Sequence, residues 1–488
     1  METARMPTSD AGSNASGETP RHYDLVVIGS GPAGEKGAAQ AAYFGKRVAV
    51  IEKEPYFGGA AANTGTLPSK TLRETALYLS GFRQRGLYGI EANLRDRATV
   101  QDFLHRERLV KEGERERIRR NFERHRIDIY RGIGRFVDPH TVAVDGPVPT
   151  TLQADRFLIA TGSRPYRPPI YPFDDQGVYD SDEILHLDTF PSSMLVAGGG
   201  VIGCEYACIF AALGVQVTLI ESRHQILSFL DDEVSERLKQ RMEALGIVFR
   251  MQDSVTEVIT EENDASYRAR LASGAVLPVE TILVASGRSG NTEELNLGAI
   301  GIPLNARGQI VVDEHFRTVV PHIYAAGDVI GFPALASASM EQGRLAMCHA
   351  FDLRYKQEMA PILPYGIYTI PEVSVAGITE EDARAQGIDI VVGRASFAQN
   401  ARGEIIGDEF GFLKLVFRRS DMKLIGTHII GESATELIHI GLTAMLADAD
   451  AELFIRTCFN YPTLSEVYKY ATYDALGHRA DHPETVFE

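Results

Sequence analysis

Two glycine-rich turns, each followed at a distance by an acidic residue, are the features of this sequence best suited to chemistry. In the first, Gly29, Gly31 and Gly34 follow a short apolar run at residues 23–28 and precede an alanine-rich stretch. Such glycines permit a tight turn and let the backbone approach a pyrophosphate, which the N-terminus of the next helix attracts. Glu52 ends the next apolar run, where a carboxylate can bind a ribose hydroxyl. This pattern predicts a dinucleotide site.

The same arrangement recurs in the middle of the chain. Gly198, Gly200 and Gly203 follow the apolar run 194–197, and Glu221 ends the run 215–220. In both units the acid lies 23 positions after the first glycine (29 to 52, 198 to 221). One such turn is weak evidence, but two complete units favour two bound dinucleotides with electron transfer between them.

The elements around the turns must be buried strands and helices. The short apolar runs are typical of parallel strands that are covered on both faces. Residues 35–44 are expected to form the first helix, with a strand at 47–51 after it. Residues 99–125 are dense in Arg and Glu and predict a long, solvated helix, although the same charge makes nucleic-acid binding conceivable.

Composition narrows the class of protein. A chain of 488 residues suits about three domains. The net charge of −17 argues against nucleic acid or an anionic membrane as partner, and no apolar run approaches the roughly 18 residues of a membrane span. Four cysteines make no disulfide framework, which indicates a reducing, cytoplasmic setting. Residues 1–22 predict a disordered tail, and no metal site is expected from the scattered histidines.

Further motifs between and after the turns carry a family resemblance. They are Ala160-Thr161-Gly162, Gly287-Arg288, the run from Tyr324 to Asp328, and Tyr368-Thr369 with Pro371-Glu372. With the two turns, they resemble the pyridine nucleotide–disulfide oxidoreductases, such as lipoamide dehydrogenase and glutathione reductase. The resemblance extends from about residue 23 to about residue 476. It implies FAD at the first glycine unit, NAD or NADP at the second, and a homodimer.

The resemblance also implies an α/β fold with two Rossmann-like dinucleotide-binding domains plus a C-terminal α+β dimerisation domain. The expected divisions are a disordered tail at 1–22, an FAD-binding domain at 23–169 and 289–363, an NAD(P)-binding domain at 170–288, and a dimerisation domain at 364–488.

The departures from the family concern its thiol chemistry. The stretch 58–70 matches the segment that carries two redox cysteines in the disulfide reductases, but here those positions are Ala61 and Thr66. Neither can form a thiolate or a disulfide. Tyr461 stands where the family places an acid–base His, and Glu466 is retained. Disulfide reduction by the family mechanism is therefore not expected, and the cysteines at 204 and 208 are interpreted as packing residues.

Two dinucleotide units without the redox cysteines and the acid–base His resemble the soluble pyridine nucleotide transhydrogenases, which exchange hydride between NADPH and NAD⁺ through FAD. The resemblance implies a ping-pong cycle through flavin N5, although related sequences tend to keep the first cysteine. One alternative is an NADH dehydrogenase or diaphorase that passes electrons to a quinone or another small acceptor. A non-enzymatic flavoprotein scaffold is a second alternative.

The family match assigns roles to single residues. Lys70 and Glu205 would form an ion pair beside flavin N5, or a structural salt bridge between domains. Tyr461 and Glu466 would reach the partner subunit's flavin site, or only pack at the interface. These four residues are the catalytic candidates.

The match also places the cofactors. The residues expected to bind FAD are Gly29, Gly31, Gly34, Glu52, Gly58, Gly59, Thr66, Lys70, Thr161, Gly162, Asp328 and Ala336, the last at the start of a helix whose dipole faces the flavin. Those expected to bind NAD(P) are Gly198, Gly200, Val201, Gly203, Glu221, Arg223 and Gly287. Val201 occupies the place where some relatives carry a gating Tyr.

Nucleotide preference stays open at this level. Glu221 suits a free 2′-hydroxyl and repels a 2′-phosphate. Arg223 could bind that phosphate, or form only a surface pair. Ser222 and Ser228 stand where NADP-specific relatives carry arginines. The residues therefore favour NAD, whereas the family resemblance favours the use of both nucleotides.

Overall fold

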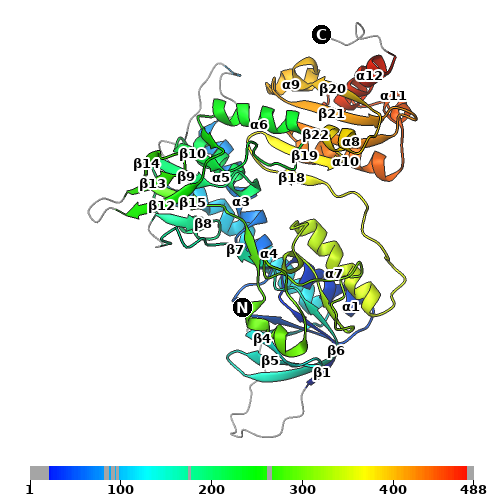
Figure 1. Ribbon diagram of the computed structural model, residues 1–488. Coiled ribbons are helices and arrows are strands. Elements are labelled where there is room, and N and C mark those ends of the chain that lie inside the picture. Colours follow the sequence, from blue (N-terminus) through cyan, green and yellow to red (C-terminus); the bar gives the residue numbers. More distant parts are fainter. Residues whose placement is uncertain are drawn as a thin grey trace, which may run out of the picture.

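The computed structural model describes residues 21–81, 87–88, 94, 98–173, 177–260 and 266–480. It contains three sheet-centred domains, drawn at the lower right, the left and the upper right of Figure 1. Among the described residues, no helix has the length and apolar character needed to cross a bilayer.

The first domain is built on one large sheet with the strand order β3-β2-β1-β6-β5-β4, and β17 pairs with β6. Its strands are β1 (Arg21–Ile28), β2 (Val48–Glu52), β3 (Asp128–Arg131), β4 (Ile133–Asp138), β5 (Thr141–Asp145), β6 (Thr150–Ile159) and β17 (Ile323–Ala325). Strands β3, β2, β1, β6 and β17 are paired in parallel. Side chains alternate between two faces along a strand, so Leu25 and Val27 of β1 enter one core while Val26 and Ile28 enter the other.

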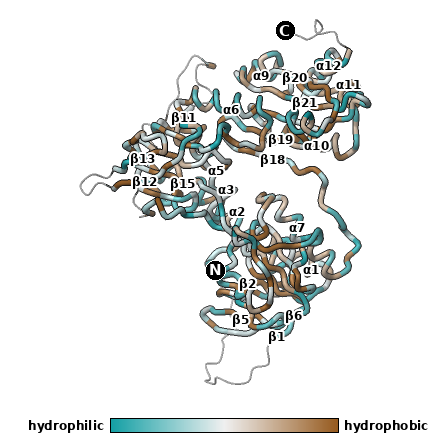
Figure 2. Tube along the Cα trace, viewed as in Figure 1, coloured by the Kyte–Doolittle hydropathy of each residue, from teal (hydrophilic) through white to brown (hydrophobic). Residues whose placement is uncertain are grey.

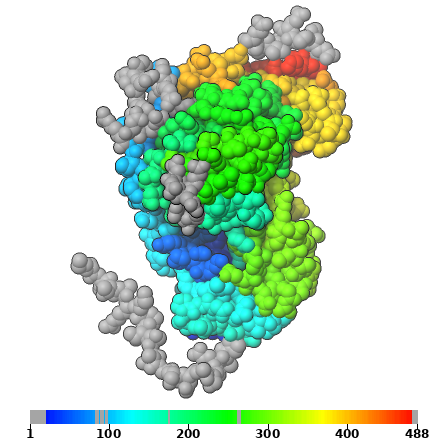
Figure 3. All heavy atoms as spheres, turned by 60° about the vertical axis from the view of Figure 1, so that its left-hand side comes forward, coloured from blue at the N-terminus to red at the C-terminus, as the bar shows by residue number. Residues whose placement is uncertain are grey.

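The helices of this domain come from distant parts of the chain. They are α1 (Pro32–Tyr43), α2 (Gly59–Asn63), α3 (Thr66–Ser80), α4 (Val100–Arg124) and α7 (Ala336–Ala350). Helices α1 and α7 cross closely, because a Cβ at Gly343 would lie only 2.2 Å from the carbonyl oxygen of Ala33. Figure 3 shows the two chain segments, coloured blue to cyan and lime, in one lobe. The first domain is therefore assembled from both sides of an insertion.

The inserted second domain has a fully parallel sheet in the order β11-β10-β9-β15-β8. Its strands are β8 (Val178–Asp180), β9 (Ser193–Ala197), β10 (Gln216–Glu221), β11 (Val248–Met251) and β15 (Thr281–Val284), with helices α5 (Val201–Ala212), α6 (Asp232–Ala244) and η3 (Glu183–His186). A separate antiparallel sheet consists of β12 (Val255–Thr260), β13 (Tyr267–Leu271) and β14 (Val276–Val279).

A small antiparallel ladder marks the passage between these two domains. Strand β7 (Ser163–Pro165) leaves the first domain, and β16 (Arg288–Gly290) returns to it. The short helices η4 (Glu293–Leu295), η5 (Leu297–Ile300) and η6 (Asp328–Ile330) follow. Both crossings thus occur side by side, which fits an inserted domain.

The third domain is antiparallel, in the order β18-β19-β22-β21-β20. Its elements are β18 (Tyr365–Ile367), β19 (Glu372–Gly377), α8 (Glu380–Ala385), β20 (Ile390–Ser396), η7 (Phe397–Gln399), α9 (Ala401–Ile406), β21 (Phe412–Arg418), β22 (Leu424–Gly431), α10 (Ala434–Leu446), α11 (Ala451–Arg456), η8 (Leu464–Glu466) and α12 (Val467–Arg479). Apolar residues of the sheet, α10 and α12 share one core. Figure 2 shows hydrophobic chain gathered within the domains and hydrophilic chain around them.

The elements predicted around the glycine turns are confirmed, with ends displaced by one to three residues. The helix expected at 35–44 is α1, and the charged stretch 99–125 is α4, in which Phe103, Ile118 and Phe122 are buried. The helix expected to begin near Ala336 is α7. The predicted tail 1–22 lies outside the described residues except for its last two: that boundary was wrong, because Arg21 and His22 already pair with β6.

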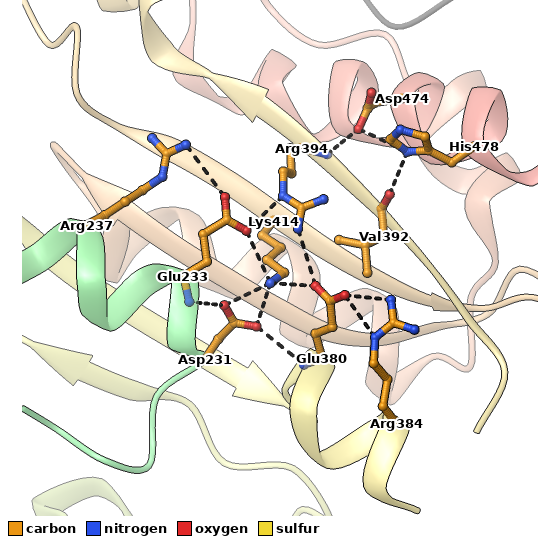
Figure 4. A network of polar contacts seen from close by, with 10 residues as sticks. All are labelled: Asp231, Glu233, Arg237, Glu380, Arg384, Val392, Arg394, Lys414, Asp474 and His478. Atoms are coloured by element: carbon orange, nitrogen blue, oxygen red, sulfur yellow. Dashed lines mark hydrogen bonds and ion pairs between the residues drawn. The ribbon is translucent and has the colours of Figure 1, made fainter. Parts of the chain in front are cut away.

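A buried charge network joins the second and third domains (Figure 4). Lys414 on β21 is 1 % exposed, and its Nζ lies 2.8 Å from Asp231 Oδ2 and 2.8 Å from Glu380 Oε2. Burial by itself raises the pKa of Glu380, but the hydrogen bonds and positive charges of Lys414, Arg384 and Arg394 together outweigh it and lower that pKa to about 2. Asp231 also begins α6, where its carboxylate accepts a hydrogen bond from the backbone of Glu233.

Candidate functional site

The first glycine turn has the geometry that a bound pyrophosphate needs. Gly29 has φ +102°, and a Cβ there would lie 2.4 Å from the carbonyl oxygen of Ala160. A Cβ at Gly34 would lie 2.0 Å from the carbonyl oxygen of Gly29, so this glycine lets α1 pack on the turn. A Cβ at Gly31 would have the Cα of Gly59 as its nearest neighbour, at 3.8 Å, which leaves the backbone open at the N-terminus of α1. Backbone N–H groups at such an end attract anions.

Glu52 closes the same turn from β2. Its carboxylate is buried and accepts hydrogen bonds from the backbone N–H of Ser30 at 2.9 Å and of Glu54 at 2.9 Å, and from the Ser30 hydroxyl. Because a carboxylate has about four acceptor positions, these bonds leave capacity for a ribose hydroxyl. Gly58 joins this assembly through its N–H, which donates to the Ser30 carbonyl at 3.1 Å.

The second glycine turn repeats this geometry. Gly198 has φ +118°, and a Cβ there would lie 2.5 Å from the carbonyl oxygen of Ala285. A Cβ at Gly203 would lie 1.9 Å from the carbonyl oxygen of Gly198. No heavy atom lies within 4 Å of a Cβ built on Gly200, among the residues described, and Val201 begins α5 beside it. Each predicted glycine of the second unit thus has the role of its counterpart in the first.

The loop after β10 holds the residues that bear on nucleotide preference. Glu221 accepts hydrogen bonds from the N–H of Gly199 at 2.7 Å and of Arg223 at 2.8 Å. The Arg223 guanidinium is exposed and donates to the Ser228 hydroxyl at 2.7 Å. The cationic group is therefore held on the loop next to the acid that ends the strand.

The predicted pair of Lys70 and Glu205 is present, where α3 meets α5. Lys70 Nζ lies 2.6 Å from Glu205 Oε2 and 2.8 Å from Oε1. Glu205 is 3 % exposed and Lys70 is 25 % exposed, so the carboxylate is buried while the ammonium reaches the surface of the site. The pair joins the first domain to the second, and either predicted role is compatible with that position.

A further partner of Glu205 comes from the third domain. The backbone N–H of Tyr368 donates to Glu205 Oε1 at 2.9 Å, and the Tyr368 ring lies 5.1 Å from Lys70 Nζ. In the sequence, Tyr368 marks only the start of the last domain. No pattern of residue types reveals this contact, because every residue except proline carries a backbone N–H.

The return segment positions the remaining predicted flavin contacts. The Ser163 hydroxyl donates to Asp328 Oδ2 at 2.9 Å, and Arg288 Nε donates to Ser163 Oγ at 2.8 Å. Thr161 Oγ1 donates to the carbonyl of Asn291 at 2.7 Å. Gly162 and Gly287 both have positive φ, at +71° and +107°. These contacts hold Asp328 together with the two segments that connect the first and second domains. Helix α7 begins at Ala336, shortly after Asp328 in the chain.

The two positions at which the disulfide reductases carry redox cysteines lie close to Lys70 in the chain. Ala61 lies in α2, and Thr66, which is exposed, begins α3 one turn before Lys70. Cys204 and Cys208 are buried in α5 and unbonded to each other. Burial raises the pKa of both thiols, that of Cys208 to about 12, so the interpretation of the two as packing residues is confirmed.

Tyr461 and Glu466 lie apart from this assembly in the third domain. Tyr461 is 74 % exposed just before η8, and Glu466 ends η8. The hydrogen bond from Asn400 Nδ2 to the carbonyl of Thr463, at 3.1 Å, ties their segment to α9. Their predicted contact with a partner subunit stays a prediction. Among the described residues, no group of three or more His, Cys, Asp or Glu could hold a metal ion.

Comparisons with known proteins agree with this geometry. Residues 23–343 match the family described as pyridine nucleotide-disulphide oxidoreductase, and residues 363–472 match its dimerisation domain. A soluble pyridine nucleotide transhydrogenase of Mycobacterium bovis is 48 % identical over 459 residues, which cover 93 % of this chain and 97 % of that protein. One of Chromohalobacter salexigens is 41 % identical over 467 residues, with 93 % and 98 % covered.

Two solved structures have a similar fold over nearly the whole chain. LpdA from Mycobacterium tuberculosis has a TM-score of 0.85 at 25 % identity, with 93 % of this chain and 99 % of that chain covered. The HOCl-induced flavoprotein disulfide reductase RclA from Escherichia coli has a TM-score of 0.83 at 28 % identity, with 92 % and 99 % covered.

Proposed function

This chain belongs to the pyridine nucleotide-disulphide oxidoreductases, and from that premise we propose that it transfers hydride between NADPH and NAD⁺ by a ping-pong cycle. It is an oxidoreductase that uses FAD, with nicotinamide nucleotides as substrates. Its dimerisation domain supports a homodimer. A cytoplasmic location is part of the proposal, and the four free cysteines are in keeping with it.

The observation that carries the proposal is the joining of two intact dinucleotide units at Lys70–Glu205, without a cysteine at either position where the disulfide reductases carry their redox pair. Disulfide reduction needs a thiolate next to the flavin, and the matching positions are Ala61 and Thr66. Hydride exchange between two nucleotides needs only binding, orientation and electrostatics from the protein. We infer that the residues at the two glycine turns and the Lys70–Glu205 pair provide this binding, orientation and charge.

The first domain fits FAD on its own geometry. The open backbone at Gly31 lies against Gly59, with 3.0 Å between the Gly31 Cα and a Cβ built on Gly59, so side chains at these two positions would fill the pyrophosphate cradle. We infer that Glu52 binds the adenosine ribose, that Asp328 binds the ribityl chain, and that Gly58, Thr66, Thr161 and Gly162 line the path between them. When bound, FAD supplies N5 as the hydride acceptor and donor.

The chain's own groups then have distinct tasks. Lys70 holds a positive charge at the site, and Glu205 fixes the position of its Nζ through both carboxylate oxygens. The N-terminus of α7 at Ala336 carries a partial positive charge, which would favour the reduced flavin if the cofactor binds in front of it. We infer that Val201 and Gly287 line the nicotinamide site at the second glycine turn, which the two nucleotides would occupy in turn. Tyr461 and Glu466 would complete the site of the partner subunit.

The proposal is tested with the purified holoenzyme by following NADPH-dependent reduction of thio-NAD⁺. Transfer from NADPH is expected, with no turnover of oxidised lipoamide. Flavin reduction by NADH, without any reaction of NADPH, would contradict the proposal and identify an NADH dehydrogenase with another acceptor. The Glu221 carboxylate, which repels a 2′-phosphate, is the observation that favours this second candidate.

Substitution of Arg223 by alanine is expected to raise the KM for NADPH roughly tenfold, because a charge-assisted hydrogen bond contributes about 1.5–3 kcal/mol and about 1.4 kcal/mol corresponds to a factor of ten. The KM for NADH should change little. Steady-state kinetics with each nucleotide measure both effects. Arg270→Ala is the matched control, since Arg270 is an exposed arginine that pairs with Glu257 on the separate three-stranded sheet. Equal increases for both nucleotides would refute a phosphate contact by Arg223.

A further inference from the structure

Arg73 is among the largest fully buried side chains of the described residues, and the proposed reaction assigns it no task. It lies in α3, three residues after Lys70, and is 2 % exposed. Residues three apart on a helix lie on the same face. A buried guanidinium one turn from the active-site ammonium requires partners, because an unpaired buried charge is strongly unfavourable.

The partners of Arg73 belong mostly to the third domain. Its Nε donates to the backbone carbonyl of Thr369 at 2.8 Å, and its Nη1 lies 3.2 Å from Glu372 Oε1. Glu372 is itself held by Thr435 of α10, whose hydroxyl donates to Oε2 at 2.8 Å. On the solvent side, Nη1 also pairs with Glu74 at 2.6 Å. Arg73 therefore fixes the start of the third domain to the first.

The segment that Arg73 holds is also the segment that contacts Glu205. Thr369 accepts from Arg73, and the preceding residue, Tyr368, donates its backbone N–H to Glu205 Oε1 at 2.9 Å. A buried ion pair is stable only where further hydrogen bonds satisfy its remaining polar atoms. The carboxylate of Glu205 thus depends on a backbone N–H whose place is set by Arg73.

We propose that Arg73 is a positioning residue for hydride transfer, which acts through the Tyr368-Thr369 segment on Glu205 and thereby on Lys70. The inference rests on the proposed role of Lys70 in hydride transfer. It is specific to arginine: one planar guanidinium donates to the Thr369 carbonyl and forms an ion pair with Glu372 at once, whereas the single ammonium of a lysine cannot reproduce that fork.

The test compares the Arg73→Met and Arg73→Lys holoenzymes with the wild type. R73M is expected to slow flavin reduction by saturating NADH roughly ten- to a hundredfold, because small displacements at a reacting centre have effects of that size. The dissociation constant of NADH should be unchanged, and the midpoint potential of the bound FAD should become more negative. The rate of flavin reduction in R73K should lie between those of R73M and wild type. Glu74→Gln is the matched control and should behave as wild type, since Glu74 is 54 % exposed.

A double-mutant cycle with Glu205→Gln separates positioning from general destabilisation. In the E205Q background, R73M should slow flavin reduction little further, because the Glu205 carboxylate through which Arg73 acts is already replaced. An equal loss in both backgrounds, an unchanged flavin potential, or a defect of the same size in E74Q would overturn the inference. If R73M loses FAD, the cycle is run with R73K. Flavin reduction by NADH does not depend on the final acceptor, so failure of the thio-NAD⁺ assay alone would reject the proposed function and not this role.

Discussion

Replacement of Lys70 by methionine is expected to slow reduction of the bound flavin by NADH or NADPH about a hundredfold, the usual effect of removing one preorganised charged group from an active site. The ammonium lies 2.6 Å from a carboxylate that is 3 % exposed, so its position is set before any nucleotide binds. Methionine keeps the length of the side chain and removes the charge. Stopped-flow absorbance at the flavin band, at saturating nucleotide, measures the change.

The chain offers a closely matched control for this substitution. Lys111 and Glu107 form an ion pair within α4 at 2.6 Å, with side chains 17 % and 2 % exposed. Lys111→Met removes the same charge from a similar environment that lacks the glycine units. It should leave flavin reduction per bound FAD unchanged. A wild-type rate in K70M, or an equal loss in K111M, would show that Lys70–Glu205 is only a structural salt bridge between domains.

Replacement of Lys414 by methionine is expected to lower the free energy of unfolding by about 3–5 kcal/mol, because it leaves buried carboxylates without their counter-ion. Asp231 is 0 % exposed and Lys414 is 1 % exposed, and Glu380 lies within 2.8 Å of the same Nζ. Urea unfolding at a fixed concentration of dimer measures the loss. The double variant Asp231→Asn with Lys414→Met should recover part of it, since removing both charges avoids an unpaired buried ion.

The same network predicts a pH dependence of stability. The pKa of Glu380 is lowered from its ordinary value of 4.5 to about 2 in the folded protein. The ionised Glu380 carboxylate therefore contributes fully to the stability of the folded protein above pH 4.5, and this contribution is lost as the pH falls toward 2. The K414M variant should lose less stability than wild type over that interval. Identical acid-unfolding profiles of K414M and wild type would show that Lys414 does not contribute to the lowered pKa of Glu380.

Much of the fold could be predicted because its signals are local. The positive φ of Gly29 and Gly198 is needed within a few residues of each strand end, and the acid follows at a fixed spacing after one helix and one strand. Only glycine tolerates these dihedral angles without strain. The first strand was expected to begin at residue 23 and begins at Arg21, because pairing with β6 extends it and no local signal reports that pairing.

The pairing of Lys70 with Glu205 was predictable only through the family resemblance, since 135 residues separate them. The buried position of Arg73, the contact of Tyr368 with Glu205 and the cluster at Lys414 were not predicted. A buried arginine and lysine look like surface residues in a sequence, and the Tyr368 contact is made by a backbone N–H that any residue but proline would carry.

The two dinucleotide units and the absence of redox thiols follow from the sequence without any structure, because they depend on residue type and short spacing. The folded chain was needed to show that a third domain completes the Glu205 environment and is tied to the second domain through Asp231 and Lys414, 183 residues apart. The physical reason is that burial of a charge is possible only where its partners meet, and tertiary folding alone brings those partners together.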